Sequence, residues 1–550
     1  MGYLHKLLET FSLWTLYVLV ALVPIFLIPS SFATIPQAKL TLVSVLVGFA
    51  ALGWLLNVLV SREIRIPRHA LFFAVPLLPL AYIVSALTFG WPMSAVVSGL
   101  AEQDTVITTA LLAAVFALTA LTLKESAIAH ISRAIMVGGA VLVAAQIVRL
   151  FFPDALTFGG VLSSATSSLA GTWHDLGILL GLFVITGGVL VSTHVSGNKA
   201  WRAFFGIVTA VSFLFLIVIS MQDIWFVLAG ILGIFGVYSW FAQARDGVEH
   251  SVMKRLVQPA LWILIALSAF LFGWFNVWVH DRLPEKMQIV AVEVRPSWEG
   301  TFSVGQNSLT NSRALLFGTG PNSFARNWAQ FKPEGVNETL FWNLDFNNGV
   351  GAVPTSFVTI GTIGIAAWIL IALAFLWAAG EALRREKLFG SAQTITFGIV
   401  CAILYLLAFH VMYAPGLAIS VLLFVLLGIL VVHIVGEKKS ILPLNLDSLP
   451  KLAGVVVALV LTVGTFVASA TSLLALASDM YVNHSVALFN RDGGIGASTA
   501  VIQKALMLWP SNDRAHRAAV ELGILELAQL GEKANTDEAA RAQLEGTLSQ

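Results

Sequence analysis

Long apolar segments recur along almost the whole chain. A helix that crosses a membrane needs about 20 mostly apolar residues, and about thirteen segments of this sequence meet that requirement. We expect these spans near residues 11–30, 39–60, 70–89, 104–122, 131–152, 174–193, 203–220, 223–243, 257–279, 352–380, 392–411, 414–434 and 452–476. Only 11% of the 550 residues are charged, against about 25% in a typical soluble chain. The sequence therefore predicts an all-α, polytopic membrane helix bundle of about 12–13 spans.

Lysine and arginine gather in every second connection between the expected spans. The even-numbered connections carry Arg62, Arg65 and Arg68; Lys124 and Arg133; Lys199 and Arg202; Arg245, Lys254 and Arg255; Arg384, Arg385 and Lys387; and Lys438, Lys439 and Lys451. Among the odd-numbered connections, the first has Lys39, the third has no basic residue, and the fifth has Arg149 nearby. Because basic connections face the cytoplasm, we expect the odd-numbered connections and the C-terminal region to lie on the outer side.

Changes of composition divide the chain into four parts. Residues 1–279 hold nine expected spans, residues 280–351 form a polar extracytoplasmic loop, and residues 352–477 hold the last four spans. Beyond residue 478, apolar residues at helical spacing flank a Pro-Ser-Asn-Asp turn, a pattern that resembles a tetratricopeptide unit. Only about one and a half such units are present, so the tail either packs on the membrane domain or continues beyond Gln550. We expect residues 478–550 to be an extracytoplasmic platform for a protein partner, with a capping helical hairpin as the alternative.

Several classes of function lack their sequence signature. The formal net charge of +1 offers no field to recruit nucleic acid, so we expect no nucleic-acid partner. No nucleotide-binding or zinc-protease motif occurs, and the single cysteine, Cys401, excludes an intramolecular disulfide and a cysteine-based metal cluster. We therefore expect no metal and no cofactor. Charged residues are nearly absent from the expected spans, which disfavours an ion-coupled transporter.

The polar loop carries the residue types that bind an anionic lipid. Arg295, Arg313 and Arg326 can hold a diphosphate through bidentate, charge-assisted hydrogen bonds, and Lys332 is a weaker candidate. For each of these arginines, an interfacial or structural ion pair is the alternative.

A glycine pair and several aromatic residues in the same loop also have two interpretations. Gly318 and Gly320 could let the backbone approach a ligand closely, although a Gly-x-Gly is more often a tight turn. Trp342 could stack on a sugar ring, whereas the interfacial belt is the more common place for such a residue.

A histidine–aspartate pair stands at the start of the sixth expected span. His174 and Asp175 follow the Ser/Gly-rich fifth connection. An ionisable pair at a span end is costly, which favours a functional role. The alternative is a helix start in which Asp175 complements the N-terminal dipole. Asp223, at a tight outward turn, is expected to be a helix cap.

Four features resemble the O-antigen ligases and polymerases, which are integral-membrane glycosyltransferases. The first feature is the single large outward loop late in the chain. The second is Gly-Thr-Trp-His-Asp-Leu-Gly at residues 171–177, and the third is Leu-Phe-Gly-Thr-Gly-Pro-Asn-Ser-Phe at residues 316–324. The fourth is Gly-Thr-Ile-Gly at residues 361–364, which opens the span after the loop. The resemblance covers roughly residues 10–440.

The resemblance implies transfer of a glycan from a polyprenyl diphosphate carrier to an acceptor on the outer side of the bacterial cytoplasmic membrane. The acceptor could be a lipid, a glycan or a protein. The implied mechanism is a metal-independent displacement at the anomeric carbon. Arg313, Arg326 and Arg295 would bind the diphosphate, and a base would assist the acceptor hydroxyl. We expect Asp345 to be that base, with His174 as the second choice.

The sequence also departs from this family. Its members carry a histidine about ten residues before the Gly-x-x-Gly, near Val350 here, but no histidine lies between His280 and His410. A family arginine after a serine has no counterpart either, since Ser220 is followed by Met-Gln-Asp. These departures favour a second hypothesis, a catalytically silent scaffold that binds a glycan or lipid and displays its helical tail. A transporter is a third hypothesis, for which no clear internal repeat is present.

Overall fold

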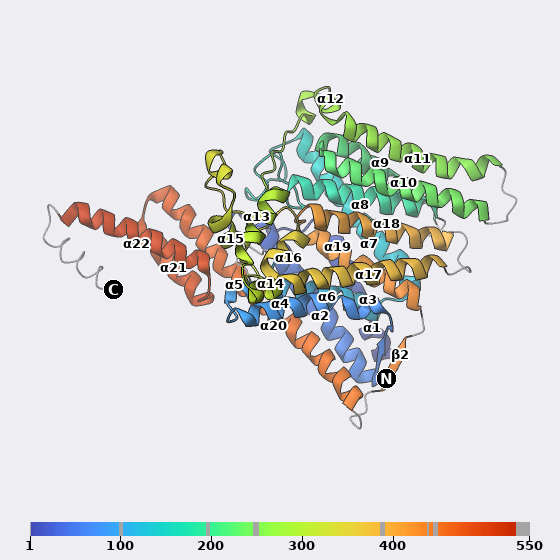
Figure 1. Ribbon diagram of the computed structural model, residues 1–550, viewed down its shortest axis with the longest axis horizontal. Coiled ribbons are helices and arrows are strands. Elements are labelled where there is room, and N and C mark those ends of the chain that lie inside the picture. Colours follow the sequence, from blue (N-terminus) through green and yellow to red (C-terminus); the bar gives the residue numbers. More distant parts are fainter. Residues whose placement is uncertain are drawn as a thin grey trace.

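The computed structural model describes residues 2–97, 103–193, 198–245, 252–384, 391–436, 439–443 and 449–534. These residues form a bundle of helices with a single two-stranded sheet among the described segments (Figure 1). The first twelve helices are α1 (Gly2–Leu22), α2 (Ile35–Ser61), α3 (Ala70–Ala74), α4 (Leu77–Thr88), α5 (Met93–Val96), α6 (Val106–Thr122), α7 (Ile128–Phe151), α8 (Trp173–Ser192), α9 (Lys199–Ile219), α10 (Gln222–Arg245), α11 (Val252–Trp274) and α12 (Asn276–His280). The remaining helices are α13 (Trp298–Ser308), α14 (Ser312–Phe317), α15 (Phe324–Phe331), α16 (Ala352–Ile360), α17 (Thr362–Arg384), α18 (Ser391–Met412), α19 (Leu417–Val435), α20 (Leu449–Asp492), α21 (Ile495–Leu508) and α22 (Asp513–Ala534).

The expected all-α membrane bundle is confirmed. In the described residues, ten helices are long and apolar enough to cross a membrane, and two further expected spans, near α6 and α11, contain shorter apolar helices. The first expected span, 11–30, differs from its helix because α1 begins at Gly2 and ends at Leu22, shortly before Pro24. Proline lacks a backbone N–H and does not continue a helix.

Two expected spans are each divided into two helices. The span near 70–89 consists of α3 and α4, and Pro76 stands at the junction. The span near 352–380 consists of α16 and α17, which are separated by Gly361 in a left-handed conformation with φ +75°. A hydropathy pattern counts apolar residues and does not register such breaks, so each pair was expected as one helix.

Helix α19 forms the centre of the bundle. Its side chains are buried on every side from residue 417 to residue 434, and it packs against α6, α17 and α18. A helix that is apolar all round is stable only when other helices surround it completely, and this explains the composition of α19.

One end of the bundle collects the connections that we expect on the cytoplasmic side. Strand β1 (Glu63–Ile66) pairs antiparallel with β2 (Ser440–Pro443), which joins the second and twelfth connections. Lys439 Nζ donates to the carbonyl oxygens of Ala120 and Leu121 at the end of α6, at 2.8 and 3.1 Å. Connections with the same predicted orientation therefore lie at the same end.

The opposite end is covered by the polar interval 280–351. This interval folds into α13, α14 and α15, with turns of 3-10 helix at Glu285–Met287 and Glu334–Glu338, and caps the bundle in Figure 1. Val304, Phe324, Trp328 and Val358 form a small core between this cap and α16. Trp328 is only 2% exposed, so it belongs to the core of the cap rather than to an interfacial belt.

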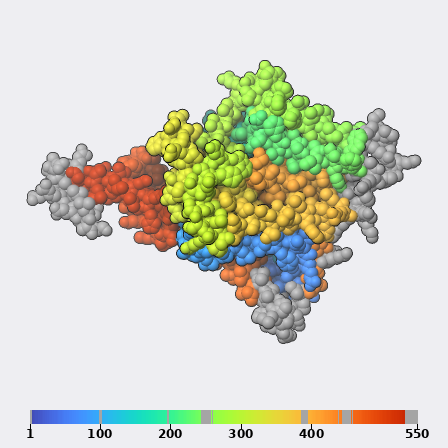
Figure 2. Space-filling model, viewed as in Figure 1, coloured from blue at the N-terminus to red at the C-terminus, as the bar shows by residue number. Residues whose placement is uncertain are grey.

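The C-terminal tail is continuous with the last span. Helix α20 contains 44 residues, so the expected boundary at residue 478 falls inside one helix. Helices α21 and α22 pack on its end through Val482, Ile502 and Leu522. Figure 2 shows this tail, coloured red, projecting beside the cap formed by the polar interval.

Candidate functional site

A cavity of about 590 Å³ lies at the capped end of the bundle. The starts of five helices line it: Thr34 and Ile35 of α2, Asp104 before α6, Thr172 before α8, Ala352 of α16, and Leu417 of α19. Each helix presents the positive end of its dipole there, which favours a negatively charged ligand. The N-caps of α16 and α19 are glycines, and partners from other elements accept at these two helix starts: the Ala352 N–H donates to the Tyr413 carbonyl oxygen at 3.1 Å, and the Gly416 N–H donates to Asp175 Oδ1 at 2.7 Å.

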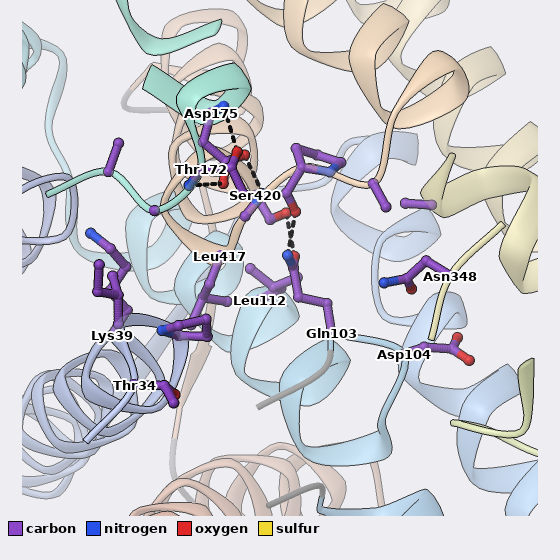
Figure 3. A pocket seen from close by; sticks show the side chains of 18 of the residues that line it. Thr34, Lys39, Gln103, Asp104, Leu112, Thr172, Asp175, Asn348, Leu417 and Ser420 are labelled. Atoms are coloured by element: carbon purple, nitrogen blue, oxygen red, sulfur yellow. Dashed lines mark hydrogen bonds between the residues drawn. The ribbon is translucent and has the colours of Figure 1, made fainter. Parts of the chain in front are cut away.

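Lys39 is the lysine that lines this cavity. Its side chain is 2% exposed, and Nζ donates to the carbonyl oxygen of Val23 at 2.5 Å. Figure 3 shows Lys39 on one side of the cavity, with Asp104 and Asn348 on the other. An ammonium group carries three donors, so Lys39 can bind an anionic group while it keeps its bond to Val23.

Asp104 connects the cavity to the glycine-rich signature of the polar interval. Its Oδ1 accepts hydrogen bonds from Tyr82 Oη at 2.7 Å and from Thr359 Oγ1 at 3.1 Å. Its Oδ2 accepts from the backbone N–H of Asn322 at 3.0 Å. Burial raises the pKa of the Asp104 carboxyl to about 6, while these three hydrogen bonds act to lower it. Asp104 therefore holds the signature against α4 and α16.

Asp175 joins the starts of α8 and α19. The Thr172 hydroxyl accepts from the Asp175 N–H at 2.9 Å, and Asp175 Oδ2 accepts from the Thr172 N–H at 3.4 Å, which forms a capping box. Asp175 Oδ1 also accepts from the N–H of Gly416 at 2.7 Å. The helix-start interpretation of Asp175 is thus correct, and the same side chain also fixes the turn before α19.

A chain of three polar side chains forms another part of the cavity wall. Ser420 Oγ lies 2.6 Å from Gln103 Oε1 and 3.1 Å from His410 Nε2 (Figure 3 labels Ser420 and Gln103). His410 Nδ1 lies 2.8 Å from the carbonyl oxygen of Leu406. Gln103 Nε2 donates to the carbonyl oxygen of Pro415. Sequence inspection missed His410 because we sought the family histidine inside the loop, whereas α18 supplies a histidine from the far side of the cavity.

His174 lies outside the cavity lining, in a separate charged cluster. Its Nδ1 is 2.5 Å from Glu293 Oε2, and its Nε2 is 3.0 Å from Asp223 Oδ2. Arg295 lies 3.8 Å from the same Asp223 oxygen. The ring also stacks on Tyr413 with centroids 4.3 Å apart. Both ring nitrogens face carboxylates, so neither faces a position where an acceptor hydroxyl could bind.

The three expected arginines each contact a different protein group. Arg295 donates to the Met412 carbonyl oxygen at 3.0 Å, and Arg326 donates to the Thr319 carbonyl oxygen at 3.3 Å. The Arg313 guanidinium lies over the ring of Phe89 at 5.0 Å. None of the three lines the cavity of about 590 Å³ as described. Their role as diphosphate ligands stays a prediction.

The other expected loop residues also lie outside the cavity. Lys332 Nζ donates to the carbonyl oxygen of Trp342, whose side chain is 59% exposed. Asp345 is exposed, whereas Asn348, three residues later, lines the cavity.

Gly318 and Gly320 serve the packing of the cap. Gly318 has φ +72°, and a Cβ there would lie 2.2 Å from the Thr359 carbonyl oxygen. The N–H groups of Thr319 and Gly320 donate to that same oxygen at 3.1 and 2.9 Å. The close backbone approach therefore occurs between α14 and the end of α16. This geometry fits the tight-turn interpretation.

A second cavity, of about 750 Å³, lies at the opposite end of the bundle. Its charged side chains compensate one another, since Lys124 pairs with Glu9 at 2.5 Å and Arg65 with Glu63 at 3.7 Å. Across the described ranges, no three histidine, cysteine or carboxylate side chains are placed to hold a metal ion.

The fold and the first cavity define the class of this protein. It is a multi-pass, all-α membrane protein with a buried, partly polar cavity at one end of its bundle. No protein-family model matches the chain, and no curated protein sequence matches it. The resemblance to the O-antigen ligases stays a prediction that depends on the motifs quoted above.

Proposed function

We propose that the protein binds a polyprenyl-diphosphate-linked glycan at this cavity and transfers the glycan to an extracytoplasmic acceptor. The observation that carries the proposal is the convergence of five helix starts and Lys39 on one cavity. Backbone N–H groups at helix starts and a buried ammonium group together favour a phosphate-type anion.

The remaining lining is compatible with a lipid-linked substrate. Leu78, Leu112, Trp368 and Phe424 provide apolar walls, while Gln103 and Asn348 provide amides that can bind sugar hydroxyls. The volume of about 590 Å³ lies within the range of about 300–1,000 Å³ that is common for small-molecule sites. A diphosphate with its first sugar is of this size class, and the rest of a glycan would extend beyond the cavity.

The proposed reaction is a displacement at the anomeric carbon. The acceptor oxygen forms a bond to this carbon, the bond from the carbon to the diphosphate oxygen breaks, and the diphosphate keeps the electron pair. Negative charge grows on the leaving diphosphate, so a fixed cation beside it lowers the barrier. Lys39 would act in that role, Arg295 and Arg313 are candidates for the part of the donor outside the cavity, and the exposed Arg326 is expected to contribute little.

A silent binding scaffold is the second candidate function. It is favoured by the surroundings of the two bases expected from sequence, because His174 is held between Asp223 and Glu293, and Asp345 is exposed away from the cavity lining. In both cases, we propose that the cap and the tail lie on the outer side of the bacterial cytoplasmic membrane and that the tail docks a protein partner.

The test is glycan transfer in vesicles that contain the purified protein and a labelled polyprenyl diphosphate donor. We expect Lys39→Met to weaken donor binding by about 10- to 100-fold, because a hydrogen bond to a charged group contributes about 1.5–3 kcal/mol. Lys439→Met at the opposite end is the matched control and should bind donor normally. Arg313→Ala and Asp345→Ala are measured alongside.

Four results are informative. Release of carrier diphosphate that depends on Lys39 supports the transferase and its anion site. Donor binding without turnover across several acceptors supports the scaffold. Absence of donor binding to the wild-type protein overturns both proposals. Release of carrier diphosphate that depends on Arg313 but not on Lys39 shows that the arginines, rather than Lys39, bind the diphosphate.

A further inference from the structure

The wall of the cavity contains a histidine–serine pair at the junction of α18 and α19. His410 and Ser420 are each 2% exposed, both line the cavity, and His410 Nε2 lies 3.1 Å from Ser420 Oγ. The nine residues between them include the turn that Asp175 fixes through the Gly416 N–H. The two side chains therefore meet because the turn returns the chain to the same face of the cavity.

The hydrogens of this cluster can be assigned from its partners. The Leu406 carbonyl oxygen can only accept, so the hydrogen of a neutral His410 lies on Nδ1, and Nε2 carries a lone pair. Gln103 donates through Nε2 to the Pro415 carbonyl oxygen, which leaves its Oε1 as an acceptor toward Ser420. Ser420 then has one hydrogen for two acceptors, His410 Nε2 and Gln103 Oε1.

The cluster thus lacks one hydrogen-bond donor within the described residues. A buried acceptor without a donor costs about 1–3 kcal/mol, so the wall is complementary to a ligand that brings a hydroxyl group. Trp368, which also lines the cavity, lies beside His410 with ring centroids 6.0 Å apart. This arrangement has the elements of an activated hydroxyl: a base, a hydroxyl within its reach, and a third group that orients the base.

The other titratable groups that line the cavity have fixed partners. Asp104 accepts from Tyr82, Thr359 and Asn322, and Asp175 accepts from Thr172 and Gly416. Lys39 donates to Val23. The Asp104 carboxylate accepts from three donors, whereas His410 Nε2 shares the single hydrogen of Ser420 with Gln103 Oε1.

We infer that His410, with Ser420 between it and the substrate, removes the proton of the acceptor hydroxyl during glycan transfer. The acceptor O–H donates its proton to Ser420 Oγ while the Ser420 hydrogen passes to His410 Nε2. The acceptor oxygen forms its bond to the anomeric carbon, and the diphosphate leaves with the electron pair. The imidazolium of His410 is stabilised by its Nδ1–H bond to Leu406 and later returns the proton to water. The inference rests on the proposed transferase function.

The test separates donor binding from turnover. His410→Gln keeps a polar side chain of similar size but cannot hold the transferred proton, so we expect donor affinity within about threefold of wild type and turnover reduced by about 100-fold or more. Ser420→Ala should reduce turnover, and Ser420→Thr, which restores a hydroxyl, should recover most of it.

The structure provides a matched control on the same two helices. His433 Nε2 lies 2.6 Å from Thr396 Oγ1, which is also a buried histidine–hydroxyl pair, but neither residue lines the cavity. His433→Gln should leave turnover unchanged. Nitrogen NMR of protein labelled with ¹⁵N-histidine gives a second readout. The signal that disappears in His410→Gln should show a protonated Nδ1 and an unprotonated Nε2 in the resting protein.

The outcomes separate the role inferred for His410 from the proposed transferase function. A wild-type protein that binds donor but transfers no glycan ends both the transferase proposal and this inference. An active wild type whose His410→Gln variant keeps full turnover, or a His410 signal with a protonated Nε2, overturns the inference alone. Loss of turnover in His410→Gln with normal donor affinity and the expected tautomer supports it.

Discussion

Ionisation of Asp104 should make the protein less stable as the pH rises from about 4 to about 6. The pKa of this buried carboxyl is raised from 3.8 to about 6 in the folded protein, so the folded state binds a proton more tightly than the unfolded state does. The neutral carboxyl is thus favoured by folding. Its contribution is fully present below pH 3.8 and is lost as the pH rises through 6. The pKa difference corresponds to about 3 kcal/mol.

The assay is the unfolding free energy, or the apparent Tm, of the purified protein in detergent between pH 3.5 and 7.5. Many carboxyl groups titrate in that window, so the informative quantity is the difference between wild type and Asp104→Asn. The asparagine cannot ionise, and the variant should lose the component of the slope that Asp104 contributes.

The asparagine of the Asp104→Asn variant also lowers the free energy of unfolding by an amount that does not depend on pH. An amide oxygen at the Oδ1 position can keep the bonds from Tyr82 and Thr359, whereas the amide NH₂ would face the N–H of Asn322. Asp281→Asn, at an exposed position of the polar interval, is the matched control and should keep the wild-type slope. Identical slopes for Asp104→Asn and wild type would refute the reasoning.

Three further predictions concern packing, the tail and the arginines. Gly361→Ala should destabilise the protein by about 2 kcal/mol or more, because a Cβ at Gly361 would lie 2.4 Å from the Gly318 nitrogen. Gly380→Ala, near the other end of α17, has open space and should be neutral or stabilising by up to about 1 kcal/mol in thermal unfolding. Asp479→Ala should release the tail, since Asp479 accepts hydrogen bonds from Gln37 at 2.6 Å and from Asn512 at 2.9 Å. We expect faster limited proteolysis between α20 and α22, and an unchanged cleavage pattern would contradict this prediction. Arg326→Ala should change donor affinity by less than about threefold, because this exposed side chain donates to Thr319 and lies outside the cavity lining; a loss as large as that of Lys39→Met would show that the donor contacts this arginine.

The fold class could be predicted from the sequence because the requirement for about 20 apolar residues is a strong local constraint. The alternation of lysine and arginine was also informative, since the second and twelfth connections, both basic, pair as β1 and β2. Breaks inside apolar segments were missed, as at Gly361, because a left-handed glycine is set by close packing against Gly318 rather than by hydropathy.

The cavity was much harder to predict. Its residues come from five helix starts that are far apart in the sequence, and no local pattern identifies such a convergence. The arginines of the loop were selected by residue type, but Arg295 and Arg326 donate to backbone carbonyl oxygens, Arg313 lies over Phe89, and none of the three lines the cavity. His410 and Ser420 stood in an apolar region where nothing local distinguished them from core residues.

One sequence signal did point to the cavity. Among the odd-numbered connections other than the polar interval 280–351, Lys39 and Arg149 are the two basic residues, and Lys39 lines the cavity. Both are buried: Lys39 donates to Val23, and Arg149 donates to the carbonyl oxygens of Leu162 and Ser164 at 3.3 and 2.8 Å. An isolated basic residue in an outward connection is therefore a candidate for a buried side chain that binds groups inside the bundle.

Because α20 is one continuous helix, it fixes the position of the tail relative to the membrane-spanning bundle. At a rise of about 1.5 Å per residue, its 44 residues measure about 66 Å, which is more than a membrane crossing requires. Asp479 of this helix binds Gln37, and Gln37 lies two residues before Lys39. A partner bound by α21 and α22 would consequently be kept at a fixed distance and orientation relative to Lys39 in the cavity.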